Sequence, residues 1–98
     1  MIRTDEQGNL FTLIGNNGYF TIKELPKTIG SLCVVFCGDT EVKKEYKLNN
    51  QTSVVVKLSK EEIESIGEGT HIWYADLVNS NGEDVDTIIY QNFVVRER

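Results

Sequence analysis

The chain has 98 residues, of which 40% are hydrophobic and 26% charged, so it suits one domain with a single modest core and is too apolar to stay disordered. Its net charge of -5 repels phosphate backbones and anionic lipid surfaces, which argues against nucleic acid and membranes as partners. The polar N-terminus lacks a signal-peptide run and no stretch approaches the roughly 18 apolar residues of a membrane span, so we expect synthesis in the cytoplasm.

The first part of the chain contains two short strand signals. Leu10–Ile14 is an apolar run between glycine-rich turns, and we expect residues 1–15 to form an edge strand or an arm. From Tyr19 to Leu25 the polarity alternates, which places Phe20 and Ile22 on one face of a strand.

The middle of the chain is also dominated by a period of two. Ser31–Cys37 is apolar on both faces, which indicates a central strand that is covered on its second side as well. Glu41–Leu48 and Ser53–Leu58 alternate between apolar and polar residues and are therefore predicted to be half-exposed strands.

One short helical turn follows. Ser59 and Glu62 match a capping box, Ile63 and Ile66 share one face, and Gly67 ends the turn.

The C-terminal part of the chain predicts a hairpin. In the aromatic strand His71–Leu77, the face that carries Trp73, Ala75 and Leu77 is expected in the core. Its partners are Phe93 and Val95 on the last strand, reached through the turn at Asn81-Gly82.

About seven short strands at regular spacing, without alternating helices, predict an all-β protein. We expect a sandwich of two antiparallel sheets with one short helical turn, built as a single domain over residues 1–98.

The residue types that usually carry chemistry lack partners in this sequence. His71 is the only histidine and is expected to bind a nearby backbone group. Cys33 and Cys37 lie on one strand with Cα atoms about 13 Å apart, beyond the roughly 7 Å limit of a disulfide, so we expect buried thiols that pack as small hydrophobes.

Two groups of carboxylates complete this search, and neither has calcium-loop spacing. The groups are Glu61, Glu62 and Glu64 on the helical turn, and Glu83, Asp84 and Asp86 near the hairpin. We expect solvated charges and predict no catalytic residue, no metal site and no cofactor.

Two tyrosines are candidates for a binding surface. Tyr74 and Tyr90 lie on the opposite parity from the core positions of their strands, so we expect them to form an exposed interaction patch.

From Gly18 to Val95 the order of features resembles the immunoglobulin-like domains of phage and prophage structural proteins, in particular the N-terminal domain of the phage baseplate upper protein. The resemblance depends on the following stretches: Gly18-Tyr19-Phe20-Thr21-Ile22, Leu58-Ser59-Lys60-Glu61-Glu62, Gly69-Thr70-His71-Ile72-Trp73-Tyr74, Asn81-Gly82, Thr87-Ile88-Ile89 and Asn92-Phe93-Val94-Val95. Residues 1–15 have no counterpart in that pattern, and their apolar side chains are candidates for pairing with another subunit.

The resemblance implies a non-enzymatic structural domain of a phage tail or baseplate, located in the virion after synthesis in the bacterial cytoplasm. Its partners would be other phage structural proteins or a second copy of itself. The alternative is a carbohydrate-binding or host-adhesion module on the same scaffold, which would use exposed aromatic residues against a glycan.

Overall fold

The computed structural model describes residues 2–98, without the side chain of Asp84. Over these residues the chain forms eight strands and one helix, so the all-β prediction and the single helical turn are confirmed. Their bounds are β1 (Arg3–Thr4), β2 (Leu10–Leu13), β3 (Gly18–Ile22), β4 (Ile29–Cys37), β5 (Glu41–Asn49), β6 (Val54–Leu58), α1 (Lys60–Ile66), β7 (Gly69–Asn79) and β8 (Asp84–Arg96). None of the described residues belongs to a helix long and apolar enough to cross a membrane.

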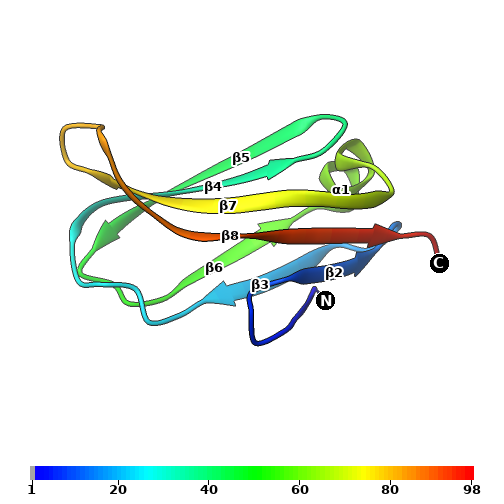
Figure 1. Ribbon diagram of the computed structural model, residues 1–98, viewed down its shortest axis with the longest axis horizontal. Helices are drawn as coiled ribbons and strands as arrows, with labels where there is room; N and C mark the ends of the chain where they lie inside the picture. The colour runs from blue at the N-terminus through cyan, green and yellow to red at the C-terminus, as the bar shows by residue number, and fades with distance from the viewer. Residues whose placement is uncertain (1) are drawn as a thin grey trace.

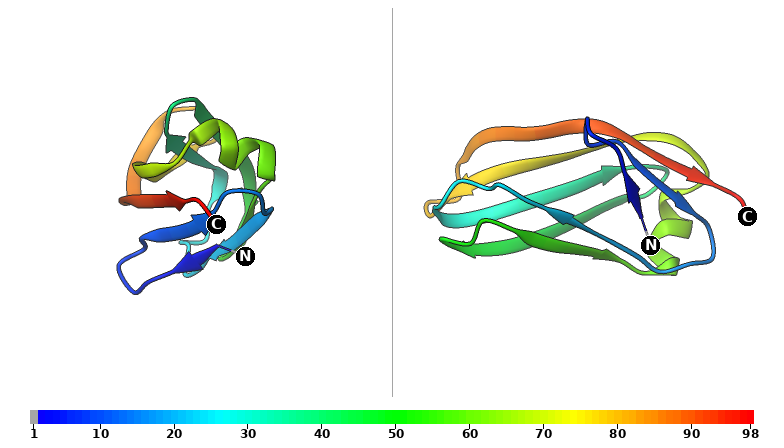
Figure 2. Two further views of the ribbon diagram at one scale, coloured as in Figure 1. Left: turned by 90° about the vertical axis from the view of Figure 1, so that its right-hand side faces the viewer. Right: turned by 90° about the horizontal axis from the view of Figure 1, so that it is seen from below.

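The strands form two sheets of unequal size. The larger has the order β1-β2-β8-β7-β4-β5, and the smaller pairs β3 with β6. Figure 1 shows the strands of the larger sheet running side by side, with α1 at one end of the molecule and the β7–β8 turn at the other. The end-on view in Figure 2 shows that the strands curl around a common interior.

Aromatic side chains join the two sheets. Phe20 on β3 has its ring centroid 5.2 Å from that of Trp73 on β7 and 6.2 Å from that of Phe36 on β4. Phe36 in turn lies 5.1 Å from Phe93 on β8. Because Trp73 is only 1% exposed, the prediction that this residue belongs to the core is confirmed.

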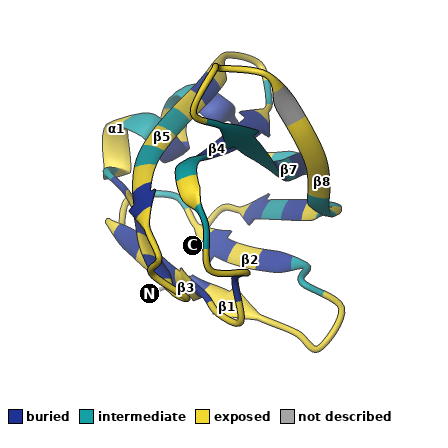
Figure 3. Ribbon diagram, turned by 90° about the vertical axis from the view of Figure 1, so that its left-hand side faces the viewer, coloured by how far each residue is buried: buried dark blue, intermediate teal, exposed yellow. Residues whose placement is uncertain are grey.

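The core faces predicted from period-two alternation are buried in the structure. Phe20 and Ile22 are buried on β3, Val54, Val56 and Leu58 on β6, and Val42 and Leu48 on β5. Figure 3 shows buried and half-buried positions alternating with exposed ones along β5. β4 is central, since it pairs with β5 on one side and with β7 on the other.

The expectation of purely antiparallel sheets is wrong at one place. β2 pairs with β8 in parallel, with Leu10 in register with Phe93 and Leu13 with Arg96. The larger sheet is therefore mixed. A parallel neighbour needs a long connection, and the whole chain between β2 and β8 provides it here.

The hairpin predicted at Asn81-Gly82 is present, and its turn is built on Asn79. The Asn79 side chain accepts hydrogen bonds from the amides of Asn81 and Glu83, and Gly82 adopts a φ of +82°. That backbone conformation favours glycine. A register shift follows between Ala75 and Asp76, which leaves β8 with one more residue than β7 at this point.

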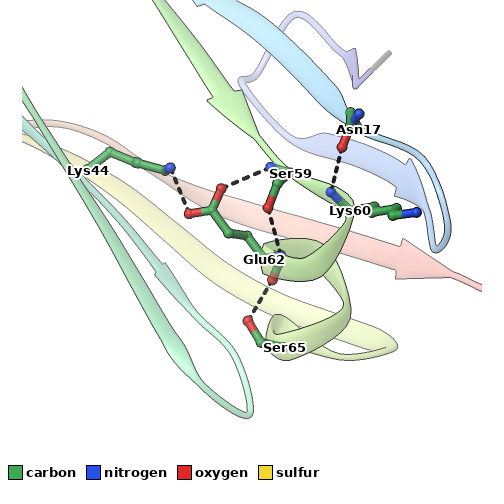
Figure 4. Close-up of polar contacts among 6 residues, drawn as sticks. All are labelled: Asn17, Lys44, Ser59, Lys60, Glu62 and Ser65. Carbon is green, nitrogen blue, oxygen red and sulfur yellow. Dashed lines mark hydrogen bonds and ion pairs between the residues drawn. The ribbon is translucent and has the colours of Figure 1, made fainter.

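Helix α1 begins with the predicted capping box (Figure 4). The Ser59 hydroxyl accepts a hydrogen bond of 3.1 Å from the Glu62 amide, and the Glu62 carboxylate accepts one of 2.9 Å from the Ser59 amide. Ile63 and Ile66 are fully buried, and the Gly67 amide closes the helix by donating to the Ile63 carbonyl. The helix is thus held by local capping and by packing of one apolar face.

Candidate interaction surface

The face of the larger sheet that points away from the core carries the two tyrosines singled out by sequence. Tyr74 on β7 and Tyr90 on β8 are directly opposite each other in the ladder. Their ring centroids are 6.2 Å apart and the rings are inclined by only 20°, which makes a stacked pair. Tyr90 is 64% exposed and Tyr74 half-buried, so the pair presents one ring largely to solvent.

Pairing register extends this feature into a row across four strands. Lys43 on β5 lies opposite Val35 on β4, and Val35 lies opposite Tyr74. Although Val35 points to the outer face, it is only 2% exposed, because it lies between the long side chains of that row. At this residue, the second side of β4 is thus covered by neighbouring side chains of the same sheet.

The electrostatic surroundings keep Tyr74 in its neutral form. Desolvation raises the pKa of its phenol, and the neighbouring acidic groups Cys37, Asp76 and Glu41 raise it further. Tyr74 is therefore a hydrogen-bond donor and an aromatic surface at neutral pH. It has no feature of an activated nucleophile or base.

The two cysteines lie on the same outer face but differ in exposure. Cys33 is 9% exposed, whereas Cys37 is exposed, which corrects the expectation that both thiols are buried. Cys37 is the last residue of β4, so no further residue of this strand lies beyond its thiol to cover it. Partial desolvation and the Glu41 carboxylate raise the pKa of the Cys37 thiol, which disfavours the reactive thiolate. No disulfide joins the two residues.

Strand β2 contributes a second apolar region to this face. Phe11 and Leu13 are exposed and line a groove of about 400 Å³ together with Val94, Arg3 and Arg96. Leu10 is buried, and it and Phe11 pair with β8 on one side and with β1 on the other. Residues 2–15 therefore contribute two strands to the larger sheet, with β1 at its edge and β2 next to it; Met1 lies outside the described residues.

The remaining candidates for chemistry whose side chains the structure describes are not brought together. The His71 Nε2 lies 2.9 Å from the Gly67 carbonyl oxygen, so the predicted backbone partner is confirmed. Among the described side chains, no three His, Cys, Asp or Glu residues gather as a metal ion requires. Of the hairpin acids, the side chain of Asp84 lies outside the described residues.

Sequence reasoning missed three polar contacts elsewhere in the sheet and at the helix. The Trp73 indole binds the Gly8 carbonyl, the Lys44 ammonium forms an ion pair of 2.7 Å with Glu62, and the Thr87 hydroxyl donates to Asp76 at 2.6 Å. The first two join residues far apart in sequence. The third depends on the register shift, which brings Thr87 opposite Asp76.

The outer face of the larger sheet therefore carries the stacked tyrosines, the exposed Phe11 and, beside it, Arg3 and Arg96. Exposed aromatic and arginine side chains are the types enriched in protein interfaces. Comparison of the chain with protein-family models, with curated proteins and with solved structures finds no match in any of the three.

Proposed function

We propose that the chain is a non-enzymatic structural domain that assembles through protein–protein contacts in a phage or prophage tail or baseplate. The observation that carries the proposal is the stacked Tyr74–Tyr90 pair on the outer face of the larger sheet. Aromatic side chains of this kind anchor protein interfaces, since they bury a large area at little cost in conformational entropy.

The proposal includes a fold relationship to immunoglobulin-like domains. Two features support it: the strands β8-β7-β4-β5 are neighbours in one sheet, and β3 pairs with β6 in the other. With β3 to β8 taken as B, C, C′, E, F and G, this arrangement corresponds to the GFCC′ and BE strands of a variable-type immunoglobulin domain. The chain departs from antibody domains in lacking a disulfide between the sheets, because both cysteines lie on β4.

Virion composition tests the phage assignment directly. Particles of the phage or prophage that encodes the chain are purified on a density gradient and analysed by mass spectrometry. We expect the chain in the particle fraction and tail defects when its gene is deleted. Its recovery only from the supernatant, with normal particles in the deletion strain, would contradict the proposal.

The same tyrosine pair supports the alternative of glycan adhesion, because sugars stack on exposed aromatic rings. Titration of the isotope-labelled chain with host cell-wall glycans, followed by NMR, separates the two functions. Saturable shifts centred on Tyr74 and Tyr90 would favour adhesion. Silence with glycans, together with incorporation of the wild-type chain but not of Tyr90→Ala into particles, would favour assembly.

A further inference from the structure

Strand β5 ends the larger sheet and leaves one of its edges without a neighbouring strand among the described residues. Its other edge is paired with β4, and the Asn50 amide continues that ladder by donating to the Thr28 carbonyl at 3.0 Å. Because hydrogen bonding alternates along an antiparallel strand, the even-numbered residues of β5 bond to β4. The backbone groups that face the open edge belong to Glu41, Lys43, Glu45 and Lys47.

The side chains at these four positions alternate in charge and are all exposed. Charged residues on an edge strand normally oppose pairing with another strand. Here the outcome depends on register, since residues directly opposite each other in an antiparallel pair attract when their charges differ and repel when they match.

In one symmetric register, each of the four charged side chains lies opposite a side chain of the other sign. When Lys44 lies opposite Lys44 of a second copy, Glu41 lies opposite Lys47 and Lys43 opposite Glu45, each pair occurring twice by symmetry. Sliding one copy by two residues in either direction places Glu opposite Glu and Lys opposite Lys. The strand therefore favours one alignment and disfavours its nearest slips.

The inner side of β5 fits the same register. Val42 lies opposite Tyr46 of the second copy, which pairs a β-branched with an aromatic residue. The two Lys44 side chains meet at the symmetry axis, and each is already neutralised by its own Glu62 at 2.7 Å (Figure 4). An open groove of about 600 Å³, lined by Lys44, Lys57 and Tyr19, lies beside this edge.

We propose that β5 is a dimerisation edge, at which two copies of this chain pair antiparallel around a two-fold axis through Lys44. Such a contact is isologous and closes at two copies. It joins the two six-stranded sheets into one continuous sheet. The outer-face tyrosines stay open on both copies, so this inference holds or fails independently of the proposed virion role.

Charge-reversal variants test the proposal by sedimentation equilibrium. We expect the wild-type chain to dimerise. Lys43→Glu/Lys47→Glu makes all four open-edge positions acidic, and Glu41→Lys/Glu45→Lys makes all four basic. Each double variant is expected to raise the dissociation constant at least about tenfold. An equimolar mixture of the two variants is expected to restore a dimer containing one copy of each.

A cross-linking pair tests the register. In a Cys37→Ser background, Lys44→Cys places two thiols opposite each other at a Cα separation of about 4.5 Å, within disulfide range. The matched control, Lys43→Cys, places each thiol opposite Glu45 and about 7–8 Å from its counterpart. We expect a disulfide-linked dimer from Lys44→Cys and little from Lys43→Cys.

Circular dichroism establishes that each variant is folded. A wild-type chain that stays monomeric at all accessible concentrations would overturn the proposal. So would dimers that persist unchanged in both charge-reversal variants, or equal cross-linking at positions 43 and 44, because each result would place the contact elsewhere or in another register.

Discussion

The indole Nε1 of Trp73 donates a hydrogen bond of 3.0 Å to the carbonyl oxygen of Gly8, which lies 65 residues earlier in the chain. This bond attaches the N-terminal segment to the centre of the aromatic core. The segment is further held by the pairing of β2 with β8. The N-terminal residues are therefore part of the folded unit.

The Trp73→Phe variant is expected to lose about 2–3 kcal/mol of unfolding free energy. The substitution leaves space in the core and removes the donor to the Gly8 carbonyl. Urea denaturation measures the loss, and hydrogen exchange is expected to accelerate in β2 more than in β4. Tyr90→Phe, which changes only an exposed hydroxyl, is the control and is expected within about 0.5 kcal/mol of wild type.

Removal of the helix cap is expected to destabilise the protein locally. Ser59→Ala removes the acceptor for the Glu62 amide and is expected to cost about 1 kcal/mol in urea denaturation. The exposed Ser53 gives a matched Ser→Ala control with an expected change below about 0.5 kcal/mol. Equal losses in both variants would show that the cap contributes nothing specific.

Glu62 is expected to make the free energy of unfolding depend on pH in the acid range. Burial opposes ionisation of this carboxylate, but its hydrogen bonds with Lys44 and Ser59 and the Lys44 charge outweigh burial and lower the pKa below its ordinary value of 4.5. The folded protein thus binds this proton less tightly than the unfolded chain does. The stabilisation is present above pH 4.5 and is lost as pH falls through the lowered pKa.

Thermal denaturation between neutral and acid pH measures this effect. Glu62→Gln is expected to reduce the difference between the melting temperatures at neutral and at acid pH. Glu64→Gln on the same helix is the control, because the ion pair of the described structure is formed by Glu62 and not by Glu64. Identical pH profiles for Glu62→Gln and wild type would contradict the assignment.

Cys37 is expected to be accessible but slow to alkylate at neutral pH. Its thiol is exposed, yet partial desolvation and Glu41 raise its pKa and so reduce the thiolate fraction. Alkylation with iodoacetamide, followed by peptide mass spectrometry across pH, measures the profile. Glu41→Gln is expected to shift the profile to lower pH, whereas Lys43→Gln, on the same strand, is not expected to lower it.

Cys33 provides an internal comparison in the same experiment. It is nearly buried, so we expect its modification mainly after unfolding. Faster labelling of Cys33 than of Cys37 in the native protein would contradict the exposures of these two residues.

The sequence by itself determined the features that depend on neighbouring residues. Period-two alternation identified the core faces of β3, β5, β6 and β7, because side chains on a strand point alternately to its two faces. The capping box of α1 could be predicted because Ser59 and Glu62 are only three residues apart. The parity of Tyr74 and Tyr90 likewise placed both on the face opposite the core.

Only the tertiary structure decided which distant segments meet. The parallel pairing of β2 with β8 and the open edge of β5 are defined by backbone hydrogen bonds. Every residue type except proline can form these bonds, so the side chains of a strand do not name its neighbour. The stacking of Tyr74 on Tyr90 required the register of β7 with β8, and the ion pair of Lys44 with Glu62 required α1 to lie against β5. Such contacts depend on the closure of the whole chain, so no local pattern specifies them.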